Sequence, residues 1–417
     1  MEGYSMNIFG IAILFALVAD YVLRISAGAL NLSHLQKKVP ETFKGLYDPE
    51  KYAKSQEYLR VNTRFSWITP TVDTAAILVF WFAGGFPALD GFVRSLGQGT
   101  IVSGLLFVGI LVALKLTLSL PFDIYDTFVI EERFGFNKTS AKTFVLDRIK
   151  GLILGTALGA PLLAAILWFF ESAGKGAWIY CWIAVTIYSL FIHYVAPTWI
   201  MPLFNKFKDL EEGDLKKAIF SYAESIRFPL ANVYVMDGSK RSAKSNAFFT
   251  GFGKNKRIVL FDTLISQHTV GELVAVLAHE MGHYKKKHIL KNLILGILES
   301  GLVFYLLSIF ITHEGLFDAF YMDRPSVYAG LVFFGMLLAP LEFFLGLITL
   351  AISRRNEYEA DRFAAETTGS GDSMIAALKK LSVNNLSNLL PHPFYVILNY
   401  SHPPVIDRIE AIEKTAS

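Results

Sequence analysis

Residues 279–283 have the sequence HEMGH, which places two histidines four residues apart. Positions i and i+4 of an α-helix lie on one face, so the imidazoles of His279 and His283 could bind a single Zn²⁺ ion. Glu280, one position round the helix, could contact a water molecule on that metal. The preceding stretch VGELVAVLA is apolar and compatible with a helix. The pattern predicts one hydrolytic zinc site per chain; the alternative is a buried histidine pair without metal.

Two histidines do not complete such a site, because a catalytic zinc usually has three protein ligands and one open position. One class of zinc protease takes a third histidine from an extended motif, which requires glycine at position 286 and histidine at position 289. This chain has Lys286 and Ile289 there. The third ligand must therefore come from another segment.

Residues 354–364, RRNEYEADRFA, contain a carboxylate pair with helical spacing. Glu357 and Asp361 are four residues apart, so Glu357 could bind the metal while Asp361 accepts a hydrogen bond from a ligand histidine. Glu359 lies about 200° round the helix from Glu357 and is not expected to share its role. Taken alone, this segment fits a solvated charged helix better, because such helices are common.

The composition indicates a membrane protein. Of the 417 residues, 53% are hydrophobic and 18% charged, whereas soluble proteins have about 45–50% and about 25%. The net charge of +3, without a basic stripe, argues against a nucleic-acid partner. Cys181 is the only cysteine, which excludes an intrachain disulfide and a cysteine-based metal site.

Membrane-spanning helices of roughly 20 apolar residues account for most of the chain. The N-terminal segment lacks a basic region before its apolar run, so we interpret it as a retained span and not as a cleaved signal peptide. The predicted organisation is mainly α-helical and polytopic, with five spans in 1–203, a metalloprotease region in 204–288, two spans in 289–352 and a C-terminal segment in 353–417. The seven predicted spans are 7–31, 67–93, 100–121, 149–170, 177–203, 289–312 and 328–352.

Basic residues set the orientation, because loops rich in Lys and Arg stay on the cytoplasmic side. The loop between the first two spans holds seven of them, whereas the alternate loops hold only Arg94, Lys175 and Arg324. This bias places the N-terminus outside and the C-terminus inside, which requires an odd number of spans. Lysines 285–287 and 291 could attract anionic lipid headgroups, but we favour the interpretation that they mark the inner boundary of the membrane.

The cytoplasmic region 204–288 is predicted to form a small α+β zincin-like catalytic unit, with strands in 231–262 and a helix over 270–288. His283 lies six residues before the sixth span, and Glu357 lies five residues after the seventh. A short outside loop joins these two spans, so their inner ends should be adjacent. At about 1.5 Å per residue, both side chains lie roughly 8–9 Å beyond the span ends, at matching height.

With these residues in place, the chain resembles the type I CAAX prenyl protease family, which are zinc endopeptidases of the bacterial inner membrane or the endoplasmic reticulum. The resemblance covers nearly the whole chain. It implies zinc ligation by His279, His283 and Glu357, catalysis by Glu280, a supporting role for Asp361, and helices that enclose a large water-filled chamber. The family-like stretches are VPETFKGLYDPEKYAKSQEYLR, FVIEERFGFNKTS, APTWIMPLFNKF, SNAFFTGFGKNKRIVLFDTL, HEMGH, NEYEADRFA and SHPPVIDRI.

The resemblance also assigns roles to three residues that the sequence alone would leave as ordinary loop or surface positions. Asn246, in SNAF, would hold the substrate backbone beside the zinc. His402 and Arg408, in SHPPVIDRI, would lie near the site, where His402 could stabilise the developing oxyanion.

The expected function is zinc-dependent hydrolysis of peptide bonds in the C-terminal CAAX tripeptides of prenylated proteins, with the active site facing the cytoplasm. One alternative is a broad-specificity quality-control protease for membrane proteins. Another is a zinc protease that cleaves inside the bilayer, although the KKKH sequence after the motif indicates an interface. A third is a non-enzymatic transporter or scaffold, since ionisable residues lie within spans, namely Asp20, Arg24, Lys115, Glu299 and Glu342.

Overall fold

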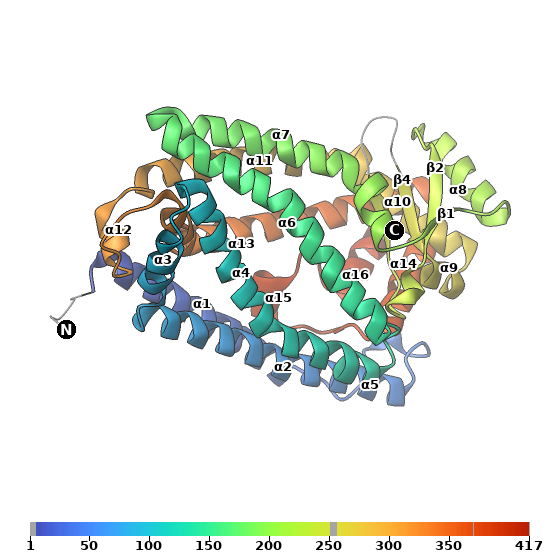
Figure 1. The fold of residues 1–417 in the computed structure, drawn as a ribbon. Helices are drawn as coiled ribbons and strands as arrows, with labels where there is room; N and C mark the ends of the chain where they lie inside the picture. The colour runs from blue at the N-terminus through green and yellow to red at the C-terminus, as the bar shows by residue number, and fades with distance from the viewer. Residues whose placement is uncertain (1–5, 251–256, 370, 417) are drawn as a thin grey trace.

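The computed structural model describes residues 6–250, 257–369 and 371–416. Within them, seven helical segments are long and apolar enough to cross a membrane, which confirms the predicted number. Figure 1 shows these segments as long rods, with the small sheet at one end of the molecule. The segments are Ile8–Ser33 (α1), Pro49–Phe82 (α2), Thr100–Phe134 (α4 to α5), Ala141–Ser172 (α6), Gly174–Leu203 (containing α7, Ala177–Val195), His288–Phe310 (α11) and Val327–Thr368 (α13).

The second span differs from its predicted range of 67–93. α2 begins at Pro49, where the Asp48 carboxylate caps the helix by accepting a backbone N–H two residues on, and proline suits the first helical position. The helix stops before Gly84, which adopts the left-handed conformation with φ of 75°. The remaining predicted residues form most of a separate short helix, α3 (Gly85–Ser95).

The seventh span continues beyond its predicted end at residue 352. α13 runs unbroken from Val327 to Thr368, so the NEYEAD sequence belongs to the same helix as the span. The Ser326 side chain caps its start, and Gly369, with φ of 67°, ends it. Because the helix is continuous, the position of the span fixes the position of the carboxylates near its C-terminal end.

No more than 17% of the most apolar window of any span is buried within the chain. Side chains that face lipid and side chains that face a hollow interior would both be exposed in this way, so the chamber itself stays a prediction. The ionisable side chains that interrupt the spans are partly paired: Arg24 binds Asp20 at 2.7 Å, and Lys115 binds Asp73. Pairing lowers the cost of charge at membrane depth.

A four-stranded sheet lies in the predicted cytoplasmic region, as expected from the strand-like runs in 231–262. Its spatial order is β1-β2-β4-β3, with β2 and β4 parallel and both outer pairs antiparallel. Residues 251–256, which fall within one of the family-like stretches, lie outside the described residues. The strands are β1 (Phe207–Asp209), β2 (Asn232–Met236), β3 (Ala247–Thr250) and β4 (Arg257–Phe261).

The helix that carries HEMGH, α10 (Val270–Lys285), lies between this sheet and α13. Its start is fixed by a capping box, in which Thr269 and Glu272 each bind the other's backbone N–H. Its inner stripe, Leu273, Leu277 and Met281, is at most 2% exposed and packs on the apolar side chains of the sheet and α8 (Asp214–Ser225). The two histidines lie two positions after members of that stripe, which turns them toward α13.

Candidate metal centre

His279, His283 and Glu357 bring one ligand atom each to a common point between α10 and α13. His283 Nε2 lies 3.1 Å from His279 Nε2 and 3.2 Å from Glu357 Oε1, and His279 Nε2 lies 3.4 Å from Glu357 Oε2. The predicted ligands from the two distant motifs therefore meet. Their assignment as ligands stays a prediction, which the following features support.

The donor set fits a small tetrahedral cation. Ligand atoms about 2.0–2.1 Å from a tetrahedral Zn²⁺ lie about 3.3–3.4 Å from one another. The two Nε2 atoms are 3.1 Å apart, and each lies 3.2–3.4 Å from a different oxygen of Glu357. Glu357 Oε2 is buried and has no hydrogen-bond partner among the described residues. A bound cation would satisfy that oxygen. A buried histidine pair without metal, the alternative interpretation, would leave that oxygen without a hydrogen bond.

Asp361 lies behind the first ligand, as predicted. Its carboxylate is 2.8 Å from His279 Nδ1 and accepts two hydrogen bonds from Arg408, at 2.7 Å from Nε and 2.6 Å from Nη2. Burial lowers the pKa of His279, but the carboxylates of Asp361 and Glu357 outweigh it and raise that pKa to about 9. The surroundings of His279 thus favour a positive charge, as a cation site requires.

Arg408 comes from α16 (Val405–Ala416) and contacts both carboxylates of α13, since its Nη1 also lies 3.5 Å from Glu357 Oε2. Burial lowers the pKa of Arg408, but the charge of Asp361 outweighs this and raises it. Arg408 therefore stays charged, and its contacts with Asp361 and Glu357 hold α16 beside the candidate metal centre.

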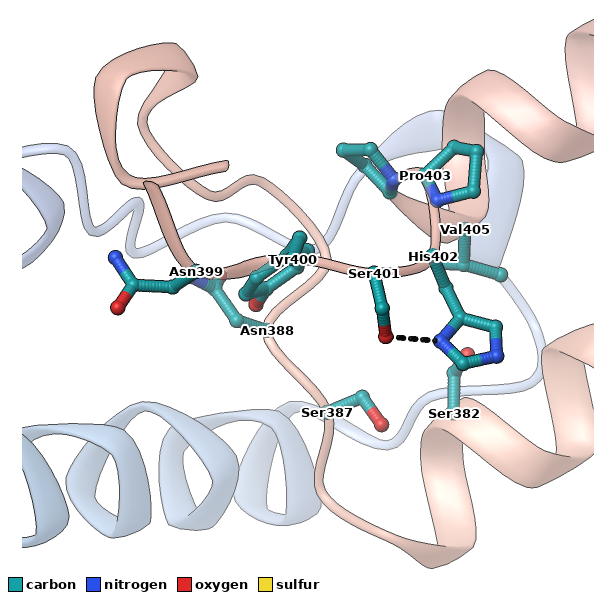
Figure 2. Close-up of a pocket in the computed structure, with 10 residues that line it drawn as sticks. Ser382, Ser387, Asn388, Asn399, Tyr400, Ser401, His402, Pro403 and Val405 are labelled. Atoms are coloured by element: carbon teal, nitrogen blue, oxygen red, sulfur yellow. Dashed lines mark hydrogen bonds between the residues drawn. The ribbon is translucent and has the colours of Figure 1, made fainter. Parts of the chain in front are cut away.

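His402 lies on the other side of Glu357, with its Nε2 3.5 Å from Oε1. Figure 2 shows its ring with the Ser401 hydroxyl beside Nδ1, at the edge of a cavity of about 330 Å³. Arg354, one turn before Glu357 on α13, donates to the carbonyl of Tyr400 at 2.7 Å and so anchors this segment. His402 thus lies next to a candidate ligand, as the resemblance of SHPPVIDRI implies.

Glu280 is partly exposed beside the ligands, on the turn that carries His279. Burial raises the pKa of its carboxyl, and the neighbouring histidines only partly offset this. A carboxylate with a raised pKa is a better proton acceptor near neutral pH. The position and basicity of Glu280 suit the general base predicted for it.

Asn246 is exposed and stands immediately before β3, the edge strand that packs against α10. The side-chain oxygen of Asn246 accepts a hydrogen bond from the backbone N–H of Ala247. Its backbone carbonyl accepts a hydrogen bond from the N–H of Phe261. None of these contacts involves the candidate ligands, so its role in holding the substrate stays a prediction.

Sequence analysis did not anticipate His288 next to the candidate ligands, nor its contact with Glu359. His288 Nδ1 lies 3.0 Å from His283 Nδ1, and its Nε2 lies 3.2 Å from Glu359 Oε2. The sequence contains this histidine five residues after His283, a spacing that on a continuous helix would point it elsewhere. Glu359 does not join the ligand group, as predicted, but it is engaged through His288.

The fold and the paired motifs define a class of protein, the polytopic membrane metalloendopeptidases. Two family models match the chain: "CAAX prenyl protease N-terminal, five membrane helices" over 29–206 and "Peptidase family M48" over 209–416. The chain belongs to peptidase family M48. It therefore uses a metal cofactor, and the transporter or scaffold alternative is excluded.

Individual relatives agree over almost the entire length. CAAX prenyl protease 1 homolog of Arabidopsis thaliana is 37% identical, covering 98% of this chain and 97% of its own. CAAX prenyl protease 1 of Saccharomyces cerevisiae is 34% identical, covering 91% and 89%. The crystal structure of S. mikatae Ste24p superposes with a TM-score of 0.90 at 35% identity, covering 97% of this chain and 99% of that chain.

Proposed function

We propose that this protein is a zinc-dependent endopeptidase that removes C-terminal CAAX tripeptides from prenylated proteins. The observation that carries the zinc proposal is the meeting of His279, His283 and Glu357, whose ligand atoms lie within 4.8 Å of one another, with each imidazole Nε2 3.2–3.4 Å from an oxygen of Glu357. The substrate class is supported by the relatives named CAAX prenyl protease 1, which match most of the chain.

The proposed roles follow from the geometry. A zinc ion held by the three ligands would polarise the scissile carbonyl and lower the pKa of the attacking water. Glu280, with its raised pKa, accepts the proton of that water and delivers it to the leaving amine. His402 lies beside Glu357 with an exposed side chain, from which it can donate a hydrogen bond to the developing oxyanion. Arg408 acts through Asp361 and holds His279 in place.

The proposed orientation has the metal centre on the cytoplasmic side of the membrane. The support is the concentration of Lys and Arg in alternate loops of the sequence. The β-sheet and α10 extend from the same end of the helices as the first turns of α2, which carry several of those basic residues (Figure 1). In sealed vesicles that have the cytoplasmic face of the membrane inside, a cysteine introduced into this region should react with a membrane-impermeant reagent only after the vesicles are opened.

The test uses the full chain purified in detergent, with zinc content and hydrolysis of a farnesylated CAAX peptide measured together. Wild type should hold about one zinc and cleave. Glu280→Gln should retain zinc and lose activity, and Glu357→Ala should lose metal affinity. Glu366→Gln, an exposed carboxylate on the same helix, is the matched control.

Two outcomes would contradict parts of this proposal. If Glu357→Ala binds zinc and cleaves like wild type, Glu357 is not the third ligand. If wild type carries zinc but cleaves an unprenylated, unfolded peptide as fast as the farnesylated one, the CAAX specificity is wrong and the broad-specificity quality-control alternative replaces it.

A further inference from the structure

A chain of two partly buried contacts leads away from the second candidate ligand. His283 Nδ1 lies 3.0 Å from His288 Nδ1, and His288 Nε2 lies 3.2 Å from Glu359 Oε2. His288 is only 2% exposed, and the other oxygen of Glu359 binds Arg355 Nε at 3.2 Å. We infer that His288 and Glu359 position His283 for metal binding, which gives Glu359 a role although it is not a ligand.

The protonation states follow from hydrogen-bond geometry. His283 presents Nε2 to the common ligand point, where a metal requires a lone pair, so its single ring proton must sit on Nδ1. The atom facing that proton is Nδ1 of His288, which must therefore be an acceptor without a proton. The proton of neutral His288 then sits on Nε2 and is donated to the carboxylate of Glu359.

Glu359 is the residue that selects this arrangement. Without an acceptor at Nε2, His288 would be free to carry its proton on Nδ1, and two N–H groups would then face each other across 3.0 Å. His283 would have to rotate or move its proton to Nε2, and either change weakens metal binding. The carboxylate thus acts on the metal through two imidazoles.

The two candidate ligand histidines are supported differently. His279 contacts the carboxylate of Asp361 directly at 2.8 Å, whereas a neutral imidazole separates His283 from Glu359. Removing a hydrogen-bond partner of a ligand histidine typically costs 10–100-fold in metal affinity or activity. The intervening imidazole keeps the orientation of His283 while holding the second carboxylate farther from the metal.

A local backbone feature makes the contact possible. α10 ends at Lys285, and Lys287 adopts the left-handed conformation with φ of 60°, after which α11 starts at His288. The change of direction returns the side chain of His288 toward the helix that precedes it. The contact between His288 and His283 therefore depends on the break between α10 and α11.

The inference rests on the proposed metal site and is tested by metal affinity, measured by competition with a chromophoric chelator. The full chain is compared with His288→Leu, His288→Asn and Glu359→Leu. His288→Leu removes the acceptor and should weaken zinc binding about 10–100-fold. His288→Asn offers an amide oxygen near the position of Nδ1 and should restore most of the affinity. Glu359→Leu should weaken binding less than His288→Leu.

Two controls separate positioning from packing. Glu366→Leu removes an exposed carboxylate two turns further along the same helix and should leave zinc affinity unchanged. Melting of the metal-free protein reports the packing cost of each variant. Because a purely structural role would lower that melting point and would not be rescued by His288→Asn, equal losses in both His288 variants would overturn the inference.

The results also distinguish this inference from the proposed function. Wild-type affinity in His288→Leu would overturn the positioning role while the zinc site stands. Failure of the wild type itself to bind zinc, or full binding by His283→Ala, would refute the ligand set and the inference with it.

Discussion

Asp361→Asn tests how much the candidate metal centre depends on the carboxylate behind His279. Three nitrogens surround that carboxylate, at 2.8 Å from His279 Nδ1 and at 2.7 and 2.6 Å from Arg408. His279 Nδ1 and Arg408 Nη2 share Oδ1, whereas Arg408 Nε binds Oδ2. Asparagine has the same shape but only one accepting oxygen, so its NH₂ group must face the guanidinium in either orientation, and in one of them it also faces the ring proton of His279. At least one N–H group then faces another N–H group, at a residue that is only 1% exposed.

The expected loss of metal affinity is 10–100-fold, which corresponds to about 1.4–2.7 kcal/mol. Competition with a chelator of known affinity measures it directly on the purified protein. Activity at saturating zinc should recover in part, because the ligands themselves are intact. Glu366→Gln, an exposed change on the same helix, is the control. A zinc affinity for Asp361→Asn within twofold of wild type would refute the argument from these three contacts.

Three further predictions concern α10. Glu280→Gln should retain zinc but lose at least about 100-fold in turnover, since it removes the proton acceptor; retained turnover would assign that role elsewhere. Gly282→Leu should weaken zinc binding, because a side chain there would start 3.1 Å from Phe363 and 3.3 Å from the backbone of Ala360 and would push α10 from α13; Gly271→Ala, which meets only an ordinary contact, is its control. Burial raises the pKa of Glu272, but its hydrogen bonds with Lys380 and Thr269 outweigh this and hold the pKa below 4.5. That group therefore stabilises the fold above about pH 4.5 and loses its effect as the pH falls further. Glu272→Gln should accordingly cost about 1 kcal/mol at pH 7 by thermal melting, with the difference vanishing in acid; a difference independent of pH would contradict the ion pair.

The sequence by itself determined the features that depend on short-range periodicity. The four-residue spacing in HEMGH and between Glu357 and Asp361 predicted two pairs of side chains, each on one helical face. The count of apolar segments predicted seven spans, and the alternation of basic loops required an odd number. Membership of family M48 agrees with the metal chemistry inferred from those spacings.

Only the tertiary structure decided what meets across large separations in the chain. Glu359 pointed away from Glu357 on the helix, and only the break at Lys287 brings His288 between it and His283. Arg408, an ordinary helix residue by sequence, gains its role because α16 packs on α13. Such contacts depend on where helices end and how they cross. A single residue in the left-handed conformation, such as Lys287, can change the direction of the chain between two helices. The hydrophobic periodicity of the sequence does not reveal such a change.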